Sequence, residues 1–307
     1  MTNPLNPQRS QNWLPTYIAL GIVWGASFLF IEKSLTFLTP VGVAFLRCFF
    51  GAGSLWCVLL YKRIPIVRDW KLYFHLWVVG LFLNVFPGIL FAFAQERVSS
   101  ILASIMNAFT PVMSVLMILV IFRTERLTIN RIFGIVLGFL GVLIVLVVGQ
   151  SLGNFSWSAF GALLLAVTCY GISFPYSSKF VMNRNLKSEL LATIQVTLSA
   201  ATLSPFFIYH GVDSYRPSAS AIFSILALGI FGTGFAYIWN FRNVALAGAS
   251  IASTVTYITP LVAVVLGLLL LGEPLTWNEP VGGLIVLVGS ALAQGRLKVF
   301  KEQTWKQ

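Results

Sequence analysis

Long apolar runs separated by short polar segments make up most of the chain. Ten runs come close to the roughly 20 residues that a helix needs to cross about 30 Å of hydrocarbon. Each is expected to be a helix, because lipid offers backbone N–H and C=O groups no partner. The runs cover residues 13–32, 41–61, 72–94, 99–122, 130–149, 157–177, 188–209, 219–242, 248–272 and 280–295. The pattern predicts an all-α integral membrane protein with ten transmembrane helices.

Composition supports the same fold class and narrows the partners. Hydrophobic residues make up 58% of the 307 residues and charged residues only 9%, whereas a soluble domain carries about 25% charged residues. The net charge of +11 does not favour a nucleic-acid partner, because the basic residues lie in short gaps and not on one face of a domain. The expected partners are the lipid bilayer and a small-molecule substrate.

The distribution of Lys and Arg predicts the orientation in the membrane. With a cytoplasmic N-terminus, 16 of the 20 Lys and Arg residues fall in cytoplasmic segments, three fall outside, and Arg47 lies within a helix. Cytoplasmic loops of membrane proteins carry such an excess of basic residues. We therefore expect a multi-pass protein of the plasma (inner) membrane with both termini in the cytoplasm.

The two halves of the chain repeat one another. The stretch "WGASFLFIEK" from Trp24 matches "YGISFPYSSK" from Tyr170. Further on, "NAFTPVMSVL" from Asn107 matches "TYITPLVAVV" from Thr256, and both are followed by Glu-x-Leu-Thr. Each unit holds five predicted helices. Because five is odd, the second unit enters the membrane from the opposite side.

The repeat predicts the domain organisation and a class of function. Residues 1–12 form a tail, 13–149 the first five-helix repeat, 157–295 the inverted second repeat, and 296–307 a basic tail. Inverted repeats about an axis in the membrane plane are typical of secondary transporters, whose substrate site lies near the midplane.

These motifs resemble those of the drug/metabolite transporter superfamily, specifically its EamA-type ten-helix members. The resemblance covers residues 13–295. It rests on "WGASF", "FLRCFF", "ASIMNAFTPV" and the paired stretches "ERLTINRIFGIVLGFLGV" and "EPLTWNEPVGGLIVLVGS". It implies an exporter of small metabolites, commonly amino acids, with a central cavity lined by helices 1, 3, 4, 6, 8 and 9. The resemblance also implies that helices 5 and 10 lie at the periphery.

Polar and aromatic residues in the middle of the predicted helices are candidates for substrate contacts. A buried amide or hydroxyl needs a partner, which is either a neighbouring helix or a bound polar ligand. Both interpretations stay open for each residue. The candidates are Trp24, Asn84, Ser104, Asn107, Tyr170, Tyr237, Trp239, Asn240, Thr256 and Tyr257.

Four further residues are candidates for gating or structural roles. Arg47 lies about 10 Å inside the second helix, at 1.5 Å per residue, and a charge at that depth needs a partner. Glu32 is the nearest acid in the sequence, and the alternative partner is a substrate carboxylate. Pro111 and Pro260 each remove a helical hydrogen bond one turn earlier, which makes them hinges or tolerated kinks.

Several kinds of chemistry have no residues to support them. The nine acids and two histidines lie in loops or near the ends of predicted helices, so no central carboxylate is available for a proton relay. The sequence has no GxxxxGK[ST] loop, no His/Cys/acid cluster for a metal and no Ser-His-Asp set. It predicts a protein that is not an enzyme, with no cofactor, no catalytic residues and no metal site. Proton coupling is expected to be weak or absent.

The favoured function is a secondary transporter that exports small polar metabolites, first of all amino acids or their derivatives, by alternating access. A multidrug or lipophilic-compound exporter is the alternative and should carry an acid in its cavity. A membrane enzyme should carry paired acids or His at the interface, and the inverted repeat disfavours a channel. One chain can complete the ten-helix fold, so we expect a monomer and leave oligomers open.

Overall fold

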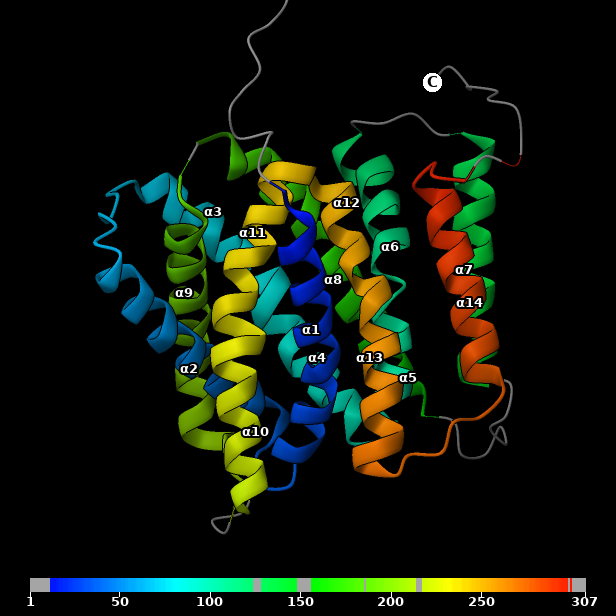
Figure 1. Ribbon diagram of the computed structural model, residues 1–307, viewed down its shortest axis with the longest axis horizontal. Helices are drawn as coiled ribbons and strands as arrows, with labels where there is room; N and C mark the ends of the chain where they lie inside the picture. Colours follow the sequence, from blue (N-terminus) through cyan, green and yellow to red (C-terminus); the bar gives the residue numbers. More distant parts are fainter. Residues whose placement is uncertain are drawn as a thin grey trace, which may run out of the picture.

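The computed structural model describes residues 12–123, 128–147, 156–184, 186–213, 217–297 and 299, which form a bundle of helices running between two faces (Figure 1). The first half contains α1 (Leu14–Ser34), α2 (Pro40–Tyr61), α3 (Trp70–Gly80), η2 (Leu81–Val85), α4 (Phe86–Gln95), α5 (Ser100–Asn107), α6 (Thr110–Met117), η3 (Ile118–Phe122) and α7 (Ile129–Val147). The second half contains α8 (Trp157–Phe180), η4 (Met182–Arg184), α9 (Ser188–His210), α10 (Ala219–Gly229), η5 (Ile230–Phe235), α11 (Ala236–Ala247), α12 (Ala249–Ser253), η6 (Thr254–Tyr257), α13 (Ile258–Leu266), η7 (Gly267–Leu271) and α14 (Asn278–Ala293).

These elements confirm the predicted all-α membrane fold. Within the described residues, eight continuous helical stretches are long and apolar enough to cross a membrane, and two shorter apolar helices, α7 and α14, complete the set. Several crossings are built from consecutive helical pieces, so that α3, η2 and α4 form one span and α12, η6, α13 and η7 form another.

Polar residues between the apolar runs set where many of the helices begin. Thr39, Asp69, Ser99, Ser156 and Ser218 each precede a helix, and each side chain accepts a hydrogen bond from a backbone N–H in the first turn. The first turn of a helix leaves these N–H groups without an intrahelical partner, and a capping side chain supplies one. The short polar gaps therefore define the entry points of the crossings.

The sequence repeat reappears as a repeat of helix irregularities. The third crossing contains the π-helical turn η2 and the eighth contains its counterpart η5. The fourth and ninth crossings end in the π-helical turns η3 and η7. Each of these two ends in a residue with positive φ, Arg123 at 48° and Gly272 at 66°. This conformation costs a non-glycine residue free energy, yet both halves adopt it at the same point.

The short helices α7 and α14 pack against each other at one side of the bundle (Figure 1). Glycines make this contact close: a Cβ atom on Gly141 would lie 2.7 Å from the Val286 nitrogen, and one on Gly289 would lie 2.5 Å from the Gly138 nitrogen. Small residues at a contact between membrane helices let the two backbones approach each other. Helices five and ten thus form a peripheral pair.

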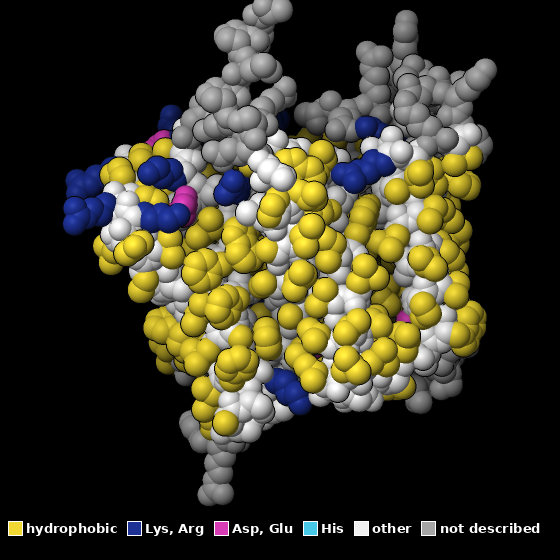
Figure 2. All heavy atoms as spheres, in the orientation of Figure 1, with side chains coloured by type: hydrophobic (Ala, Val, Ile, Leu, Met, Phe, Trp, Pro, Cys, Tyr) yellow, Lys and Arg dark blue, Asp and Glu magenta, His cyan; other side chains and the backbone are white. Residues whose placement is uncertain are grey.

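Basic side chains mark one face of the bundle, which we call the basic face. α1 begins and α14 ends at this face, which is uppermost in Figure 1. It carries Lys62, Arg68 and Lys187, and Figure 2 shows Lys and Arg gathered along it. Among the described residues, the basic side chains of the opposite face are Lys33 and Arg97. The asymmetry matches the distribution that the sequence predicts.

The glycine contact between α7 and α14 predicts the effect of a larger side chain. Gly141→Val should lower the midpoint of thermal unfolding in detergent, because overpacking a close contact costs about 1–3 kcal/mol. Gly161→Val is the matched control, since a Cβ at Gly161 would have nothing within 4 Å. Equal midpoints for the two variants would show that the α7–α14 contact does not hold the fold together.

Candidate functional site

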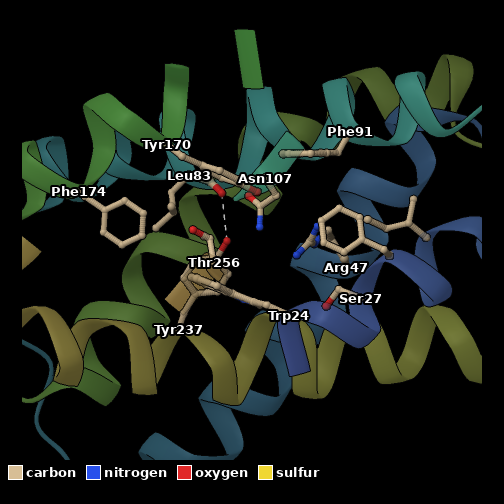
Figure 3. Close-up of a pocket in the computed structure, with 12 residues that line it drawn as sticks. Trp24, Ser27, Arg47, Leu83, Phe91, Asn107, Tyr170, Phe174, Tyr237 and Thr256 are labelled. Carbon is tan, nitrogen blue, oxygen red and sulfur yellow. Dashed lines mark hydrogen bonds between the residues drawn. The ribbon is translucent and has the colours of Figure 1, made fainter. Parts of the chain in front are cut away.

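A cavity with a volume of about 40 Å³ lies between the two halves of the bundle. Its walls come from crossings one to four of the first half and from crossings six, eight and nine of the second (Figure 3). The second crossing is an addition to the set that the family resemblance implies. The lining residues are Trp24, Ser27, Phe28, Ile31, Arg47, Leu83, Phe91, Asn107, Tyr170, Phe174, Tyr237 and Thr256.

Interruptions of the helices place several of these residues on the cavity wall. Leu83 lies in η2, Asn107 is the last residue of α5, and Thr256 lies in η6. Pro111 and Pro260 lack the N–H that would reach the carbonyls of Asn107 and Thr256 in a continuous helix. Non-helical backbone at membrane depth is tolerated where it is buried in protein or lines a cavity. Both prolines therefore mark breaks beside the cavity.

Side chains supply the hydrogen bonds that these interruptions leave open. The Tyr237 hydroxyl donates to the Leu83 carbonyl at 3.0 Å, which is the dashed line in Figure 3. The Thr259 hydroxyl donates to the Thr256 carbonyl at 2.8 Å. The Asn107 amide donates to the Thr259 hydroxyl at 3.3 Å and so connects the fourth and ninth crossings. The polar atoms around the breaks are thus largely occupied within the protein.

Aromatic rings form most of the remaining wall. The ring centroids of Trp24 and Tyr237 lie 6.0 Å apart, and those of Phe91 and Tyr170 lie 5.7 Å apart in a stacked arrangement. Phe28 meets the same Phe91 ring edge-on at 5.7 Å. Pairs at such separations add to the stability of a wall beyond the burial of area. The cavity therefore presents flat apolar surfaces on several sides.

Arg47 brings a positive charge to this cavity. Its side chain is buried, and its Nε donates to the Thr233 hydroxyl at 3.1 Å. Figure 3 shows the guanidinium turned toward the same space as the amide nitrogen of Asn107. The predicted pairing of Arg47 with Glu32 is wrong. The ion pairs among the described residues join other side chains. A buried charge without a counter-charge is costly, so this site favours an anionic ligand group.

Glu32 instead lies where the cavity approaches the opposite face. Gln95 donates from Nε2 to the Phe28 carbonyl at 2.9 Å and to the Glu32 carboxylate at 3.5 Å. Nearby, the Glu273 carboxylate accepts hydrogen bonds from the Ser100 nitrogen and hydroxyl, both at 2.9 Å, and from the Ile101 nitrogen at 3.2 Å. These contacts connect crossings one and three and crossings four and nine. They tie these crossings together at the opposite face.

The basic-face end is hollowed. A second space of about 350 Å³ is lined there by the ends of η3 and α8 and by the turn that begins α12. Pro175, which lines this space, follows the cavity residue Phe174. The two ends of the bundle therefore differ in the described residues: hydrogen bonds tie the helix ends at the opposite face, and a space lies between the helix ends at the basic face.

Half of the ten predicted substrate-contact residues line the cavity, namely Trp24, Asn107, Tyr170, Tyr237 and Thr256. The structure places the other five elsewhere, because depth along a helix does not reveal which way a side chain faces.

Asn84 accepts a hydrogen bond from Gln195 at 2.6 Å between helices, and Ser104 donates to the Ile101 carbonyl at 2.6 Å within α5. Asn240 is buried in α11, Tyr257 lies in η6, and Trp239 lines a separate groove beside α2.

Sequence reasoning missed half of the lining. Phe28 and Phe174 are equivalent positions in the repeated "GASF" and "GISF" stretches, so the repeat carried a signal for both. Ser27 belongs to the same stretch. Ile31, Leu83 and Phe91 are apolar residues in apolar helices, and nothing in the sequence distinguishes them from residues that face lipid.

Comparison with known proteins agrees with this architecture. The sequence profile described as "EamA-like transporter family" matches residues 11–147 and again residues 157–294. An uncharacterized transporter of Archaeoglobus fulgidus is 30% identical over 269 residues, covering 87% of this chain and 92% of the relative. The uncharacterized transporter YdfC of Bacillus subtilis is 27% identical over 87% of this chain and 86% of its own.

Two further comparisons bear on location and fold. The uncharacterized inner membrane transporter YedA of Escherichia coli is 26% identical over 88% of each chain. One crystal structure superposes with a TM-score of 0.66 at 18% identity, covering 92% of this chain and 96% of that chain. The last likeness shows the fold alone.

The hydrogen bonds of Glu273 predict how the opposite-face end opens. Glu273→Ala leaves the Ser100 and Ile101 nitrogens without their partner, which costs about 1–2 kcal/mol and should raise the open population about five- to thirtyfold. The readout is Ser27→Cys in the cavity, with the three native cysteines replaced by alanine. A membrane-impermeant thiol reagent applied from the opposite face should label this cysteine faster in the Glu273 variant.

Glu96→Ala is the control for this experiment. Glu96 lies on the same face but pairs with its neighbour Arg97 at 2.8 Å, so its removal should leave the labelling rate unchanged. Labelling that rises equally in both variants would show that lost negative charge, and not the lost contact, controls access.

Proposed function

Because the chain belongs to the EamA-like transporter family, we propose that it is a secondary transporter that exports small polar metabolites, amino acids first, by alternating access. Its membership in a transporter family and its multi-pass membrane fold are the premises. The substrate class, the direction and the coupling are the proposal.

The observation that carries the substrate class is the guanidinium of Arg47 in a cavity whose lining has no carboxylate. A planar guanidinium forms two parallel hydrogen bonds with a carboxylate, and these are among the strongest hydrogen bonds in proteins. The aromatic faces of Trp24, Tyr170 and Tyr237 suit the rest of an amino acid, because ring faces attract an ammonium group and also pack against apolar side chains. A small zwitterion therefore finds complementary groups for both of its ends, with Arg47 facing its carboxylate and the aromatic rings facing its ammonium group and side chain.

The inverted halves support alternating access. Exchanging the conformations of two inverted units converts a shape open on one side into a shape open on the other. In the described structure the opposite-face end is tied by Glu32, Gln95 and Glu273, while the basic-face end is hollowed. We assign hinge roles to Pro111 and Pro260, since each marks a helix break beside the cavity.

The charges of the cavity also bear on coupling and on the alternatives. The lining contains no carboxylate or histidine, which supports transport that is uncoupled or weakly coupled to protons. A multidrug exporter of lipophilic cations needs an acid near its substrate, and Arg47 supplies the opposite charge.

Counterflow in proteoliposomes tests the substrate class. Vesicles preloaded with an amino-acid mixture should exchange labelled amino acid at equal pH on both sides, and amines that lack the carboxylate should not exchange. Arg47→Gln should weaken apparent affinity about ten- to a hundredfold, because a hydrogen bond to a charged group contributes about 1.5–3 kcal/mol. Arg47→Lys should retain part of it, since the charge remains.

The controls separate binding from folding. Each variant is compared by its elution profile and thermal midpoint, and Arg97→Gln, on the opposite face, should leave exchange unchanged. Exchange of amines as fast as that of amino acids would contradict the carboxylate assignment. Exchange that depends strongly on an imposed pH gradient would contradict uncoupled transport and direct attention to Glu32.

The membrane orientation has its own test. We expect the basic face to lie in the cytoplasm of a plasma membrane, because Lys and Arg concentrate there. In intact cells, a membrane-impermeant maleimide should label Ser218→Cys on the opposite face. Lys71→Cys on the basic face should react only after permeabilisation. The reverse pattern would invert the proposed orientation and with it the assignment of export.

A further inference from the structure

A continuous trough follows the membrane-facing side of α2, away from the substrate cavity. It has an upper space of about 880 Å³ near the basic face and a lower space of about 720 Å³ farther along α2 toward the opposite face. The two spaces share Ser54, Cys57 and Ile230 in their linings, so they adjoin each other. The walls come from α2, α9 and the crossing formed by α10, η5 and α11.

The upper end of the trough is positively charged. Lys62, Lys187 and Arg242 line it, against the single lining carboxylate of Glu189, which Lys62 contacts at 2.7 Å. Figure 2 shows Lys and Arg side chains gathered at the upper left of the molecule, above a hydrophobic surface. A set of cations between membrane helices at the cytoplasmic side is suited to an anionic lipid headgroup.

Amphipathic side chains lie beside these cations. Tyr61 and Trp239 both line the upper space, and such rings are enriched at the depth of the lipid headgroups. Trp239 was a candidate for substrate contact by its sequence position. The structure gives it a place in this trough instead.

The lower space is apolar and exists because its floor is made of small residues. Phe49, Phe50 and Ile230 form walls, and Ala52, Gly53, Ala200, Ala201 and Ser204 lie on the facing helices α2 and α9. A Cβ atom on Gly53 would have nothing within 4 Å, so the space above this glycine is open.

The length of the trough suits a lipid chain. From Phe45 to Lys62, α2 rises about 25 Å at 1.5 Å per residue. One leaflet contributes about half of a hydrocarbon core of about 30 Å. An acyl chain that starts at the cations therefore fits within the trough along its whole length.

We propose that this trough binds an anionic phospholipid, with the headgroup phosphate at Lys62, Lys187 and Arg242 and an acyl chain lying over Gly53. Charge complementarity favours this occupant over a second copy of the chain, because a symmetric dimer through this face would bring the same cations together. The inference rests on the membrane location and does not depend on which substrate the cavity takes.

Native mass spectrometry of the purified protein, with phosphatidylglycerol or phosphatidylcholine added, tests the proposal. The wild-type protein should retain phosphatidylglycerol more tightly than phosphatidylcholine. Lys187→Gln should weaken phosphatidylglycerol binding about fivefold, which corresponds to about 1 kcal/mol per basic side chain near an anionic surface. Gly53→Trp should weaken it as well, by filling the space of the acyl chain.

Matched controls exist for both variants. Lys71→Gln removes an exposed cation of the same face outside the trough. Gly161→Trp adds the same bulk at an exposed glycine of α8 that also has open space. Neither should change lipid retention, and added inorganic phosphate should not displace the lipid.

Three outcomes would overturn the proposal. Equal retention of the two lipids would show that the headgroup is not recognised. Competition by inorganic phosphate would show a simple anion site without an acyl chain. A dimer mass that Gly53→Trp abolishes would show that the trough is a face between two copies of the chain.

Discussion

The cavity between the two halves depends on one constraint: in hydrocarbon, every backbone polar group needs a partner within the protein. Four crossings are interrupted near the centre of the bundle, and each interruption leaves carbonyl groups without their helical donor. Tyr237 supplies a donor for Leu83, Thr259 for Thr256, and the Thr233 hydroxyl for Leu228 at 3.1 Å. Tyr237 reaches Leu83 from the other half, whereas Thr259 and Thr233 bond carbonyls of their own crossings.

This use of polar side chains explains why few of them are left for a ligand. The hydroxyl and amide groups around the cavity mostly serve their own backbone or a neighbouring helix. Arg47 is different, because Thr233 engages only its Nε and the rest of the guanidinium faces the cavity. A cation in a low-dielectric site interacts strongly with any anion that enters. The charge that costs free energy in the empty cavity is thus the group best placed to attract an anion.

The two halves share a pattern but differ in their contacts, and this difference is what a transporter requires. Glu273 follows the ninth crossing and accepts hydrogen bonds from the N-terminus of α5 at the opposite face. At the basic face, the described residues around the start of α12 line a hollow. The repeat relates the two ends in sequence, and the contacts distinguish them.

The sequence by itself determined that the chain lies in a lipid bilayer, that it is built of helices and that these helices are duplicated. Apolar runs long enough to cross a membrane allow little but helices. The biased distribution of Lys and Arg indicates which helix ends share one face. Spaced identities such as Thr110-Pro111 with Thr259-Pro260 reveal the inverted repeat. Half of the predicted contact residues line the cavity. These residues were identifiable because they recur in the repeat or because they lie at helix breaks.

Only the tertiary structure decided which face of each helix turns inward. In a helix surrounded by lipid and by other apolar helices, the pattern of hydrophobicity is nearly uniform around the axis, so rotation leaves no mark in the sequence. In the sequence, Asn84 and Trp239 therefore cannot be distinguished from Asn107 and Trp24. In the structure, Asn84 makes a contact between helices and Trp239 lines the outer trough. The partner of Arg47 was equally hidden: Thr233 is distant in sequence and lies in a π-helical turn, and packing alone brings the two together.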